Sequence, residues 1–599
     1  MTDTTRADAA PQLAASDIDT AFRDPALPLD ERVGNLLGQM TLEEKAGLFF
    51  HSMITIGAGG ELAEEDSAFG LPSTDDYVAG KFMSHFNVLG SAPDALMMAR
   101  WQNRLQERAA STRLGIPVTL STDPRHSFSD NPGAAMAAGP FSQWPEMLGL
   151  AAIGDEAVVE EFARVARLEY TAVGLRVALH PQIDLATEPR WSRQIATFGE
   201  DADLTSHLVA AYIRGFQGEA LGEQSVATMT KHFPGGGPQK DGEDPHFAYG
   251  REQVYPGGRF EHHLKPFEAA FEAGTSQIMP YYGMPVGTEY EEVGFGFNKS
   301  VITGLLRERF GFDGIVCTDW GLLTDASIMG AEFPARAWGI EHLSPRERML
   351  TALNAGVDQF GGESCPELLI DLVHSGEISE ERLDVSARRL LREKFRLALF
   401  DAPFVDEKRA QAIVGSAEFR AAGEKAQRAA ITVLTNDRIL PLKRGLRLYV
   451  EGIDPAIAGE YGDVVNSPDQ ADAAVLRLQA PYETRDTMFE NFFHAGSLEF
   501  SDEVLEHVVS VAAFVPTVVD VFLDRPAILA PIVDAAGAVV ANFGANPRAL
   551  LDVLVGDAGP QGRLPFDVPR SMAAVHDSRP DVPFDTEDPL FRFGHGLSL

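Results

Sequence analysis

The chain has 599 residues, with 50 Lys and Arg against 88 Asp and Glu, so its formal net charge at pH 7 is −38. This length predicts two or three domains, and an apolar fraction of 45% with 23% charged residues is typical of a globular protein. The acidic excess argues against nucleic acid as a partner, because binding to a phosphate backbone needs clustered Lys and Arg.

The N-terminal segment and the cysteines indicate the compartment. Residues 1–28 are polar, contain no secretory signal and are predicted to form a loose arm. No run of about 18 apolar residues predicts a membrane span. Cys317 and Cys365 cannot build a disulfide framework, and reduced thiols are expected. We therefore expect a cytoplasmic protein without a membrane partner.

A helical pattern begins after the arm. Val33, Leu36 and Met40 follow one another at spacings of three and four residues, as on one face of a helix. Thr41 followed by Glu44 predicts a capping box that opens the next helix.

Between residues 110 and 400, short apolar runs alternate with longer amphipathic segments such as 155–174 and 258–274. This alternation predicts an α/β fold with a parallel sheet, and the number of repeats favours a (β/α)₈-type barrel. The predicted strands are 116–122, 175–181, 225–233, 276–282 and 314–320.

The same alternation returns nearer the C-terminus and predicts a second α/β domain with a mainly parallel sheet. The expected organisation is an arm at 1–28, a barrel at 29–400, a linker at 401–418 and an α/β sandwich domain at 419–599 that contributes a catalytic loop.

Polar residues at the predicted strand ends are the first candidates for chemistry. The carboxyl ends of barrel strands converge on one mouth, where active sites are built. Asp319 can act as a nucleophile toward a sugar and Trp320 can stack on its ring, although a helix-capping Asp is an equally good interpretation. Lys231 and His232 can donate hydrogen bonds to sugar hydroxyls, and Asp123 can accept them or simply form a turn.

Two arginines flank a tryptophan in PRWSR. Arg193 can make forked hydrogen bonds to hydroxyls or to a carboxylate. Arg190 is predicted to form a structural ion pair with Glu200 or Asp201.

The acidic loop that follows KHFPGGG lacks the spacing of a metal site or of a phosphate loop. We expect its polar residues to be solvated, with no metal bound and no cofactor required. They are Asp241, Glu243, Asp244 and His246.

A second carboxyl group is needed for retaining glycoside hydrolysis, at roughly 5–5.5 Å from the nucleophile. Glu483 follows a predicted strand of the second domain and is the candidate acid/base. Glu490, His494 and Glu499 are rivals in the same region.

Together these motifs resemble the glycoside hydrolase family 3 β-glycosidases. The resemblance extends from about residue 28 to the last residue, through MTLEEK, PRWSR…FGED, KHFPGG, GIVCTDW, ITVLTND, QGRLPFDVP and FRFGHGLSL. It implies a (β/α)₈-like domain, a six-stranded sandwich domain and an active site at their junction. It also implies a two-domain form without the fibronectin-like domain that many relatives carry.

The resemblance also implies roles for individual residues. Asp319 matches the family's nucleophile, and Glu483 matches the proton donor of the plant exo-glucanase branch. The residues that match positions holding the non-reducing-end sugar are Asp123, Arg193, Lys231, His232 and Tyr282, with Trp320 flanking that sugar.

The expected function is exo-acting, retaining β-glycoside hydrolysis, with a β-glucosidase favoured and small glycosides or oligosaccharides as substrates. One alternative is a β-N-acetylglucosaminidase that uses Asp244 and His246 as an acid/base dyad. Another is a sugar-binding relative without activity. Phosphorolysis, the choice between glucose and xylose, and a homodimer against a monomer stay open.

Overall fold

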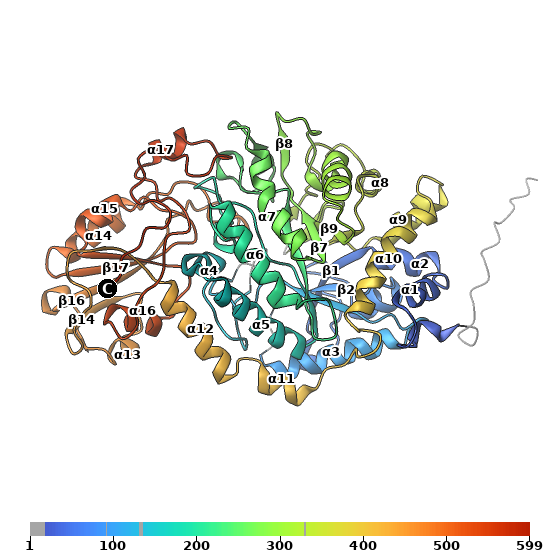
Figure 1. Ribbon diagram of the computed structural model, residues 1–599, viewed down its shortest axis with the longest axis horizontal. Helices are drawn as coiled ribbons and strands as arrows, with labels where there is room; N and C mark the ends of the chain where they lie inside the picture. The colour runs from blue at the N-terminus through green and yellow to red at the C-terminus, as the bar shows by residue number, and fades with distance from the viewer. Residues whose placement is uncertain (1–17, 91–92, 131–135, 329–330) are drawn as a thin grey trace, which may run out of the picture.

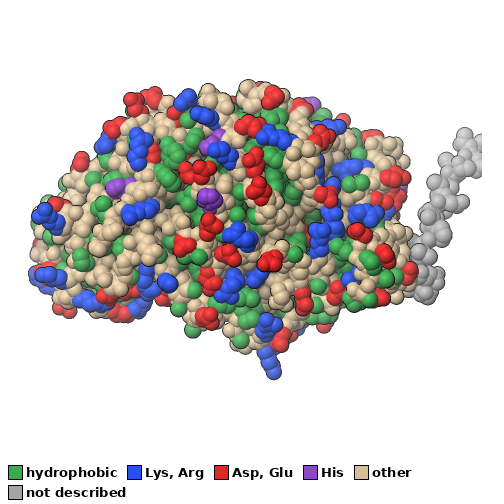
Figure 2. Space-filling model, viewed as in Figure 1, with side chains coloured by type: hydrophobic (Ala, Val, Ile, Leu, Met, Phe, Trp, Pro, Cys, Tyr) green, Lys and Arg blue, Asp and Glu red, His purple; other side chains and the backbone are tan. Residues whose placement is uncertain are grey.

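The computed structural model describes residues 18–90, 93–130, 136–328 and 331–599. Figure 1 shows a barrel built from the first two thirds of the chain beside a smaller sheet domain, drawn in orange and red, that ends at the C-terminus. In the described part, none of the helices is long and apolar enough to cross a membrane. On the face drawn in Figure 2, acidic and basic side chains are intermixed.

The barrel is closed by eight parallel strands whose order in space follows their order in the chain, which confirms the predicted fold class. Because neighbouring strands are parallel, each connection returns outside the barrel and all carboxyl ends meet at one mouth. The strands are β1 (Phe50–Thr55), β2 (His85–Leu89), β3 (Thr119–Thr122), β4 (Leu175–Ala178), β5 (Ala227–Phe233), β7 (Gln277–Pro280), β9 (Ile315–Trp320) and β12 (Gln359–Gly361).

Strands β1, β2 and β12 are missing from the sequence-based prediction. His51, Asn87 and Gln359 lie within them and are nearly fully buried. These polar residues interrupt the apolar runs by which strands are found in a sequence. His51 bonds to Ser121 Oγ at 2.6 Å and Gln359 to the Leu48 carbonyl at 3.0 Å, so neither is left unsatisfied.

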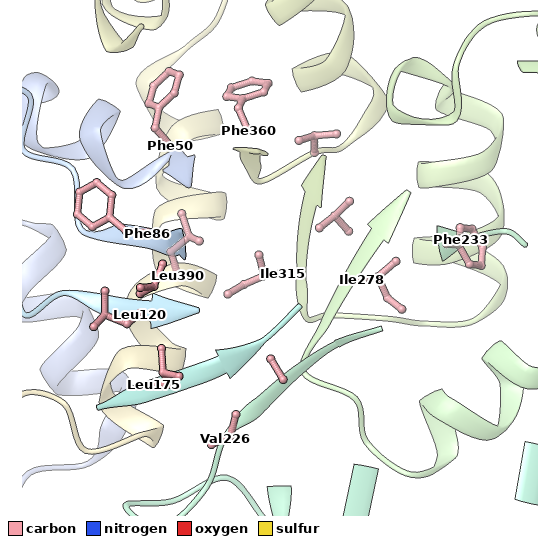
Figure 3. Close-up of a cluster of buried hydrophobic side chains, with 14 of the residues drawn as sticks. Phe50, Phe86, Leu120, Leu175, Val226, Phe233, Ile278, Ile315, Phe360 and Leu390 are labelled. Carbon is pink, nitrogen blue, oxygen red and sulfur yellow. The ribbon is translucent and has the colours of Figure 1, made fainter. Parts of the chain in front are cut away.

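Helices cover the outside of the barrel and bury the apolar residues of its strands. Figure 3 shows Leu390 beside Phe86, Leu120 and Leu175, which project from three neighbouring strands. All four side chains are fully buried, so this helix–barrel contact is part of the main core. The long covering helices are α3 (Ala95–Ala110), α5 (Glu156–Ala172), α6 (Ala202–Gln217), α7 (Phe260–Glu272), η9 (Ser300–Arg309), α8 (Pro345–Ala355) and α10 (Glu380–Arg396).

Two shorter helices precede the barrel, α1 (Leu29–Leu37) and α2 (Leu42–Leu48), and the predicted capping box of Thr41 and Glu44 is confirmed. The end of the expected arm is not loose. Phe22 in η2 (Thr20–Arg23) is fully buried and packs on Phe400 with ring centroids 5.9 Å apart. A single large apolar residue thus fixes residues 18–28, while residues 1–17 lie outside the described part.

The second domain contains a six-stranded sheet in the order β13-β18-β17-β16-β14-β15. Only β13 runs antiparallel to its neighbour, so the sheet is mainly parallel, as predicted. Its strands are β13 (Thr432–Asn436), β14 (Arg447–Glu451), β15 (Asp463–Val464), β16 (Ala473–Gln479), β17 (Thr517–Phe522) and β18 (Ala538–Asn542), with α14 (Asp502–Ala512) and α16 (Pro547–Leu554) among its helices.

The two domains share backbone hydrogen bonds and core residues. Helix α4 (Met147–Ile153) places Leu148 in the apolar core of the second domain. Glu146 N donates to Phe543 O at 2.8 Å, and Arg563 N donates to Ala152 O at 2.9 Å. Between the domains lie α11 (Glu407–Ile413), within the predicted linker, and α12 (Ala417–Ala430).

Candidate active site

Asp319 ends strand β9 with one oxygen held and the other free. Trp320 N donates to its Oδ1 at 2.8 Å. Oδ2 is buried without a hydrogen-bond partner among the described residues and lies 3.7 Å from His232 Nε2. The residue is only 7% exposed. A fixed carboxylate with one unsatisfied oxygen at the barrel mouth is suited to attack an electrophilic carbon.

His232 is oriented by Asp184, a residue that sequence reasoning missed. His232 Nδ1 lies 2.9 Å from Asp184 Oδ2, and Gly236 N also donates to this carboxylate. Burial lowers the pKa of His232 well below its ordinary value, with Arg193 and Lys231 adding to the effect. Burial also raises the pKa of Asp184 to about 6.

Near neutral pH, Asp184 is therefore ionised and takes the Nδ1–H of a neutral His232. The free Nε2 of His232 then presents a hydrogen-bond acceptor to the site, whereas the sequence suggested a donor. This acceptor faces the unpartnered oxygen of Asp319, so a ligand hydroxyl between them would donate rather than accept.

Lys231 and Asp123 form the opposite side of the site. Lys231 Nζ lies 3.1 Å from Asp123 Oδ1, and Asn87 Nδ2 donates to Asp123 Oδ2 at 3.3 Å. Each of the three is less than a tenth exposed. The pair supplies a charged donor from the end of β5 and a charged acceptor directly after β3, with β4 between the two strands, and such a pair can recognise neighbouring hydroxyls.

Arg193 is 3% exposed, and its Nε has no hydrogen-bond partner in the described part of the chain. The carboxylates of Asp244, Asp319 and Asp184 act with Tyr281 to raise its pKa, although burial opposes them. A buried guanidinium among three carboxylates balances part of their charge and leaves donors free for a ligand.

Arg190 does not pair with Glu200 or Asp201, as the sequence suggested. Its guanidinium binds Glu188 through both carboxylate oxygens, at 2.8 and 3.0 Å. Glu200 instead accepts from Asp567 N and Phe584 N of the second domain. The partner is a nearer carboxylate than the two expected, because the fold turns Glu200 toward the domain junction.

Tyr282 joins strand ends β7 and β9. Its hydroxyl donates to Trp320 O at 2.8 Å and accepts from Trp320 N at 2.9 Å. The ring centroid of Trp320 lies 5.4 Å from that of His51, so the indole is supported from inside the barrel. Tyr282 thus fixes the backbone beside Asp319.

The side chains of Asp244 and His246 are buried, which overturns the expectation of solvation for these two, whereas Asp241 is exposed as expected. Asp244 Oδ1 lies 2.6 Å from His246 Nδ1 and also accepts from His246 N. The imidazole packs on Tyr282 and on Phe493 of the second domain, with centroids 4.6 Å apart in both cases. Glu243 is paired as well, with Arg485 at 2.8 Å. The segment is too short to show a regular alternation of acidic and apolar residues, so nothing in its sequence indicated this burial.

Glu483 lies in the loop after β16 and is the most exposed of the predicted site residues, with 56% of its side chain accessible. Its Oε1 accepts from Ser497 N at 3.1 Å, and its Oε2 lies 3.8 Å from Arg485 Nη2. In the described part, no hydrogen bond or ion pair joins Glu483 to Asp319. The second domain therefore brings this carboxyl group to the junction without locking it.

Two of the three rival residues have side-chain partners of their own. Glu490 accepts from Tyr249 at 3.0 Å and from Thr487 at 2.7 Å. His494 is stacked on Tyr482, with centroids 3.9 Å apart, and bonds to Asp524. Glu499 is exposed, and its carboxylate has no partner among the described residues, so these contacts argue against Glu490 and His494 but not against Glu499.

Two other kinds of site come into question, a metal site and a second catalytic cavity. The described residues contain no cluster of His, Cys, Asp and Glu that could hold a metal ion. A cavity of about 610 Å³ lies at the amino ends of the barrel strands, next to Ser276 and Gly314, and Arg389 on its wall already pairs with Asp313. Cys317 and Cys365 are free and buried.

A parallel barrel that gathers a free carboxylate, an oriented imidazole, a Lys–Asp pair and an arginine at one mouth defines a barrel-type glycoside hydrolase. The chain belongs to glycosyl hydrolase family 3, because residues 81–393 match the family's N-terminal domain and residues 450–599 its C-terminal domain.

Individual proteins resemble the chain over most of its length. It is 52% identical to the beta-glucosidase C of Emericella nidulans, over 98% of this chain and 95% of that protein. It is 42% identical to a periplasmic beta-glucosidase/beta-xylosidase of Dickeya chrysanthemi, over 96% and 91%. A solved structure of a β-glucosidase from Erythrobacter marinus shares the fold, with a TM-score of 0.78, 22% identity and coverage of 97% and 84%.

Proposed function

We propose that the protein is an exo-acting, retaining β-glucosidase that removes the non-reducing-end sugar from small β-glucosides and oligosaccharides. One observation carries the proposal: Asp319 presents a single unsatisfied oxygen beside His232, Lys231 and Asp123 at the barrel mouth. The names of the relatives at 52% and 42% identity support glucose as the sugar, and the second of them adds xylose as an alternative.

In the first step, a free oxygen of Asp319 attacks the anomeric carbon while the bond to the leaving oxygen breaks. Glu483 donates its proton to that oxygen, and a glycosyl ester forms on Asp319. In the second step, Glu483 takes a proton from water, the water oxygen attacks the anomeric carbon, and Asp319 is released. Two inversions at one carbon retain its configuration.

The binding residues divide the sugar's hydroxyls among themselves. Lys231 and Arg193 donate, Asp123 accepts, and His232 accepts through Nε2, while Trp320 covers one face of the ring. These groups are buried, and several lack a hydrogen-bond partner. Each sugar hydroxyl that binds supplies one of the missing hydrogen bonds, so a sugar that carries every one of these hydroxyls is favoured.

A panel of 4-nitrophenyl β-glycosides, followed by disaccharides of different linkage, tests the proposal. Glucoside turnover above that of the xyloside and the N-acetylglucosaminide, with a β-configured first product by NMR, is expected. An inverted product or no glucoside turnover would overturn it.

A β-N-acetylglucosaminidase is the second candidate, because Asp244 and His246 form the buried pair that such a dyad requires. The His246 ring packs between Tyr282 and Phe493, which favours a supporting role instead. Preferred turnover of the N-acetylglucosaminide would reverse this ranking.

A further inference from the structure

Arg336 is a cation without a counter-ion at the mouth of the site. Arg336 N donates to Gly321 O at 2.9 Å, and a Cβ on Gly321 would lie 2.8 Å from Arg336 Nη1. Gly321 directly follows Trp320, so the guanidinium lies beside the end of the strand that carries Asp319. Within the described residues, Arg336 forms no ion pair, and its Nε is buried without a hydrogen-bond partner.

The charge of Arg336 acts on the buried carboxylate of Glu363, whose pKa burial raises and Arg336 lowers, but no ion pair joins the two among the described residues. Glu363 accepts from Leu323 N at 2.7 Å and from Thr324 Oγ1 at 2.6 Å, so its carboxylate is committed to the loop after β9. The field of Arg336 reaches His246, whose pKa is lowered by burial with Arg193 and Arg336 adding to the effect. It also reaches Tyr282, whose pKa burial raises well above its ordinary value while Arg336 opposes that rise. Its charge is therefore directed at the site.

A row of packed aromatic rings begins at this cation, and we call it the aromatic rim. Phe333 lies under the guanidinium, 5.8 Å from Arg336 Cζ, and packs edge-on against Phe489 at 5.0 Å. Phe247 packs on Phe489 at 5.8 Å and on Phe493 at 5.7 Å. The rim is Phe247, Phe333, Phe489 and Phe493.

Two rings of the rim come from the loop that carries the proposed acid. Phe489 and Phe493 belong to the same second-domain loop as Glu483, and the acid must reach the leaving oxygen. A group bound beyond that oxygen therefore meets aromatic edges and one unpaired guanidinium. Sugars need many hydrogen-bond partners, whereas this combination offers apolar area and a forked cation.

We propose that the aromatic rim and Arg336 select β-glucosides whose leaving group is an aromatic ring bearing a carboxylate. The ring packs against Phe333 and Phe489, and the carboxylate accepts from the guanidinium of Arg336. This inference rests on the proposed function and names the substrate class of the same site. Because water is displaced at the mouth, the forked hydrogen bonds between the guanidinium and the carboxylate are stronger than an ion pair on the surface.

The test compares 4-carboxyphenyl β-glucoside with its methyl ester, which keeps the ring and the ester carbonyl but removes the charge. The wild-type enzyme should favour the acid in kcat/KM by about tenfold, and 0.5 M NaCl should reduce that ratio because salt screens the pair. In Arg336→Gln the ratio should fall toward one, and Arg336→Lys should restore part of it.

Arg346→Gln is the matched control, since Arg346 is partly exposed and its charge is already paired with Glu377 at 2.9 Å. It should leave the ratio and both constants unchanged. A wild-type ratio near one, or a ratio that Arg336→Gln does not change, would overturn the inference. Turnover of neither glucoside would instead count against the proposed function, so the two failures are distinct. Thermal melting identifies a misfolded variant, and the salt series on the wild-type enzyme needs no variant.

Discussion

The two sides of the site are built very differently. The barrel side places Asp319, His232, Lys231 and Asp123 on strands or directly after them, each less than a tenth exposed. The second-domain side places Glu483 on a loop, with over half of its side chain accessible. Strand ends fix side chains through the sheet itself, whereas a loop depends on the surface against which it packs.

The difference matches the different tasks of the two sides, sugar recognition and proton transfer. Groups that recognise the sugar need fixed geometry, because hydroxyls are matched one by one. A proton donor must serve leaving groups of varied shape and then admit water. Substitutions on the two sides should therefore differ in the size and the kind of their effects.

Loss of the nucleophile should have the largest effect. Asp319→Ala removes the atom that forms the glycosyl intermediate, so kcat should fall by roughly 10⁴-fold for every β-glucoside. Steady-state hydrolysis of 4-nitrophenyl β-glucoside measures it. Because the site would otherwise persist, glucose should still bind, and a variant with appreciable turnover would favour a different nucleophile.

Loss of the acid/base should depend on the leaving group. Glu483→Ala should lower kcat/KM by about 10²- to 10⁴-fold for disaccharides, which need protonation, and less for nitrophenyl glucosides. Azide should restore turnover and give a β-glucosyl azide. His246→Ala is the paired comparison, and rescue of that variant instead of Glu483→Ala would assign the dyad as the acid/base.

The ion pair between Arg485 and Glu243 should matter because it ties the exposed loop to the barrel. Arg485 Nη2 lies 2.8 Å from Glu243 Oε1, and both side chains are only about a quarter exposed. Arg485→Met should lower kcat/KM by about tenfold, since small displacements of a catalytic group are costly.

A double-mutant cycle with Glu243→Gln gives the coupling between the two residues. The barrel side should be spared, so the inhibition constant of glucose should change much less than kcat. Additive effects of the two substitutions would show that the pair does not position Glu483.

The smallest effect concerns pH and sugar binding. The pKa of Asp184 is raised to about 6, so the residue is ionised above that pH and neutral below it. As the pH falls through 6, Asp184 loses its charge and becomes a weaker acceptor for the His232 Nδ1–H, so glucose should inhibit several-fold more weakly. Asp184→Asn should remove this dependence and weaken inhibition at pH 7. An unchanged pH profile in the variant would assign the transition to another group.

Much of the fold follows from local pattern. Apolar runs such as 225–233 and amphipathic segments such as 155–174 became strand β5 and helix α5 because burial on one face rewards that periodicity. Strands β1, β2 and β12 escaped prediction since polar residues inside a barrel are satisfied by partners from distant strands. The sequence alone does not show these hydrogen-bond partners.

The candidate site divides in the same way. Its residue types and their positions at strand ends are readable from the chain, as for Asp319 and Lys231. Asp184 could have been suspected from IDLATEPRW, where a carboxylate follows a buried run, but its partner His232 is 48 residues away.

The sequence by itself determined the acidic, two-domain α/β character and the carboxylate at the end of GIVCTDW, because composition and short-range periodicity encode them. Which charged groups find a partner of opposite charge depends on the folded chain. It buried Asp244 and His246, paired Arg190 with Glu188, turned Glu200 to the domain junction and left Arg336 alone. The physical reason is that the spacing of charges along the chain does not tell which of several nearby carboxylates a guanidinium reaches, or which groups other segments enclose. Those distances of a few ångströms are set only in the folded chain.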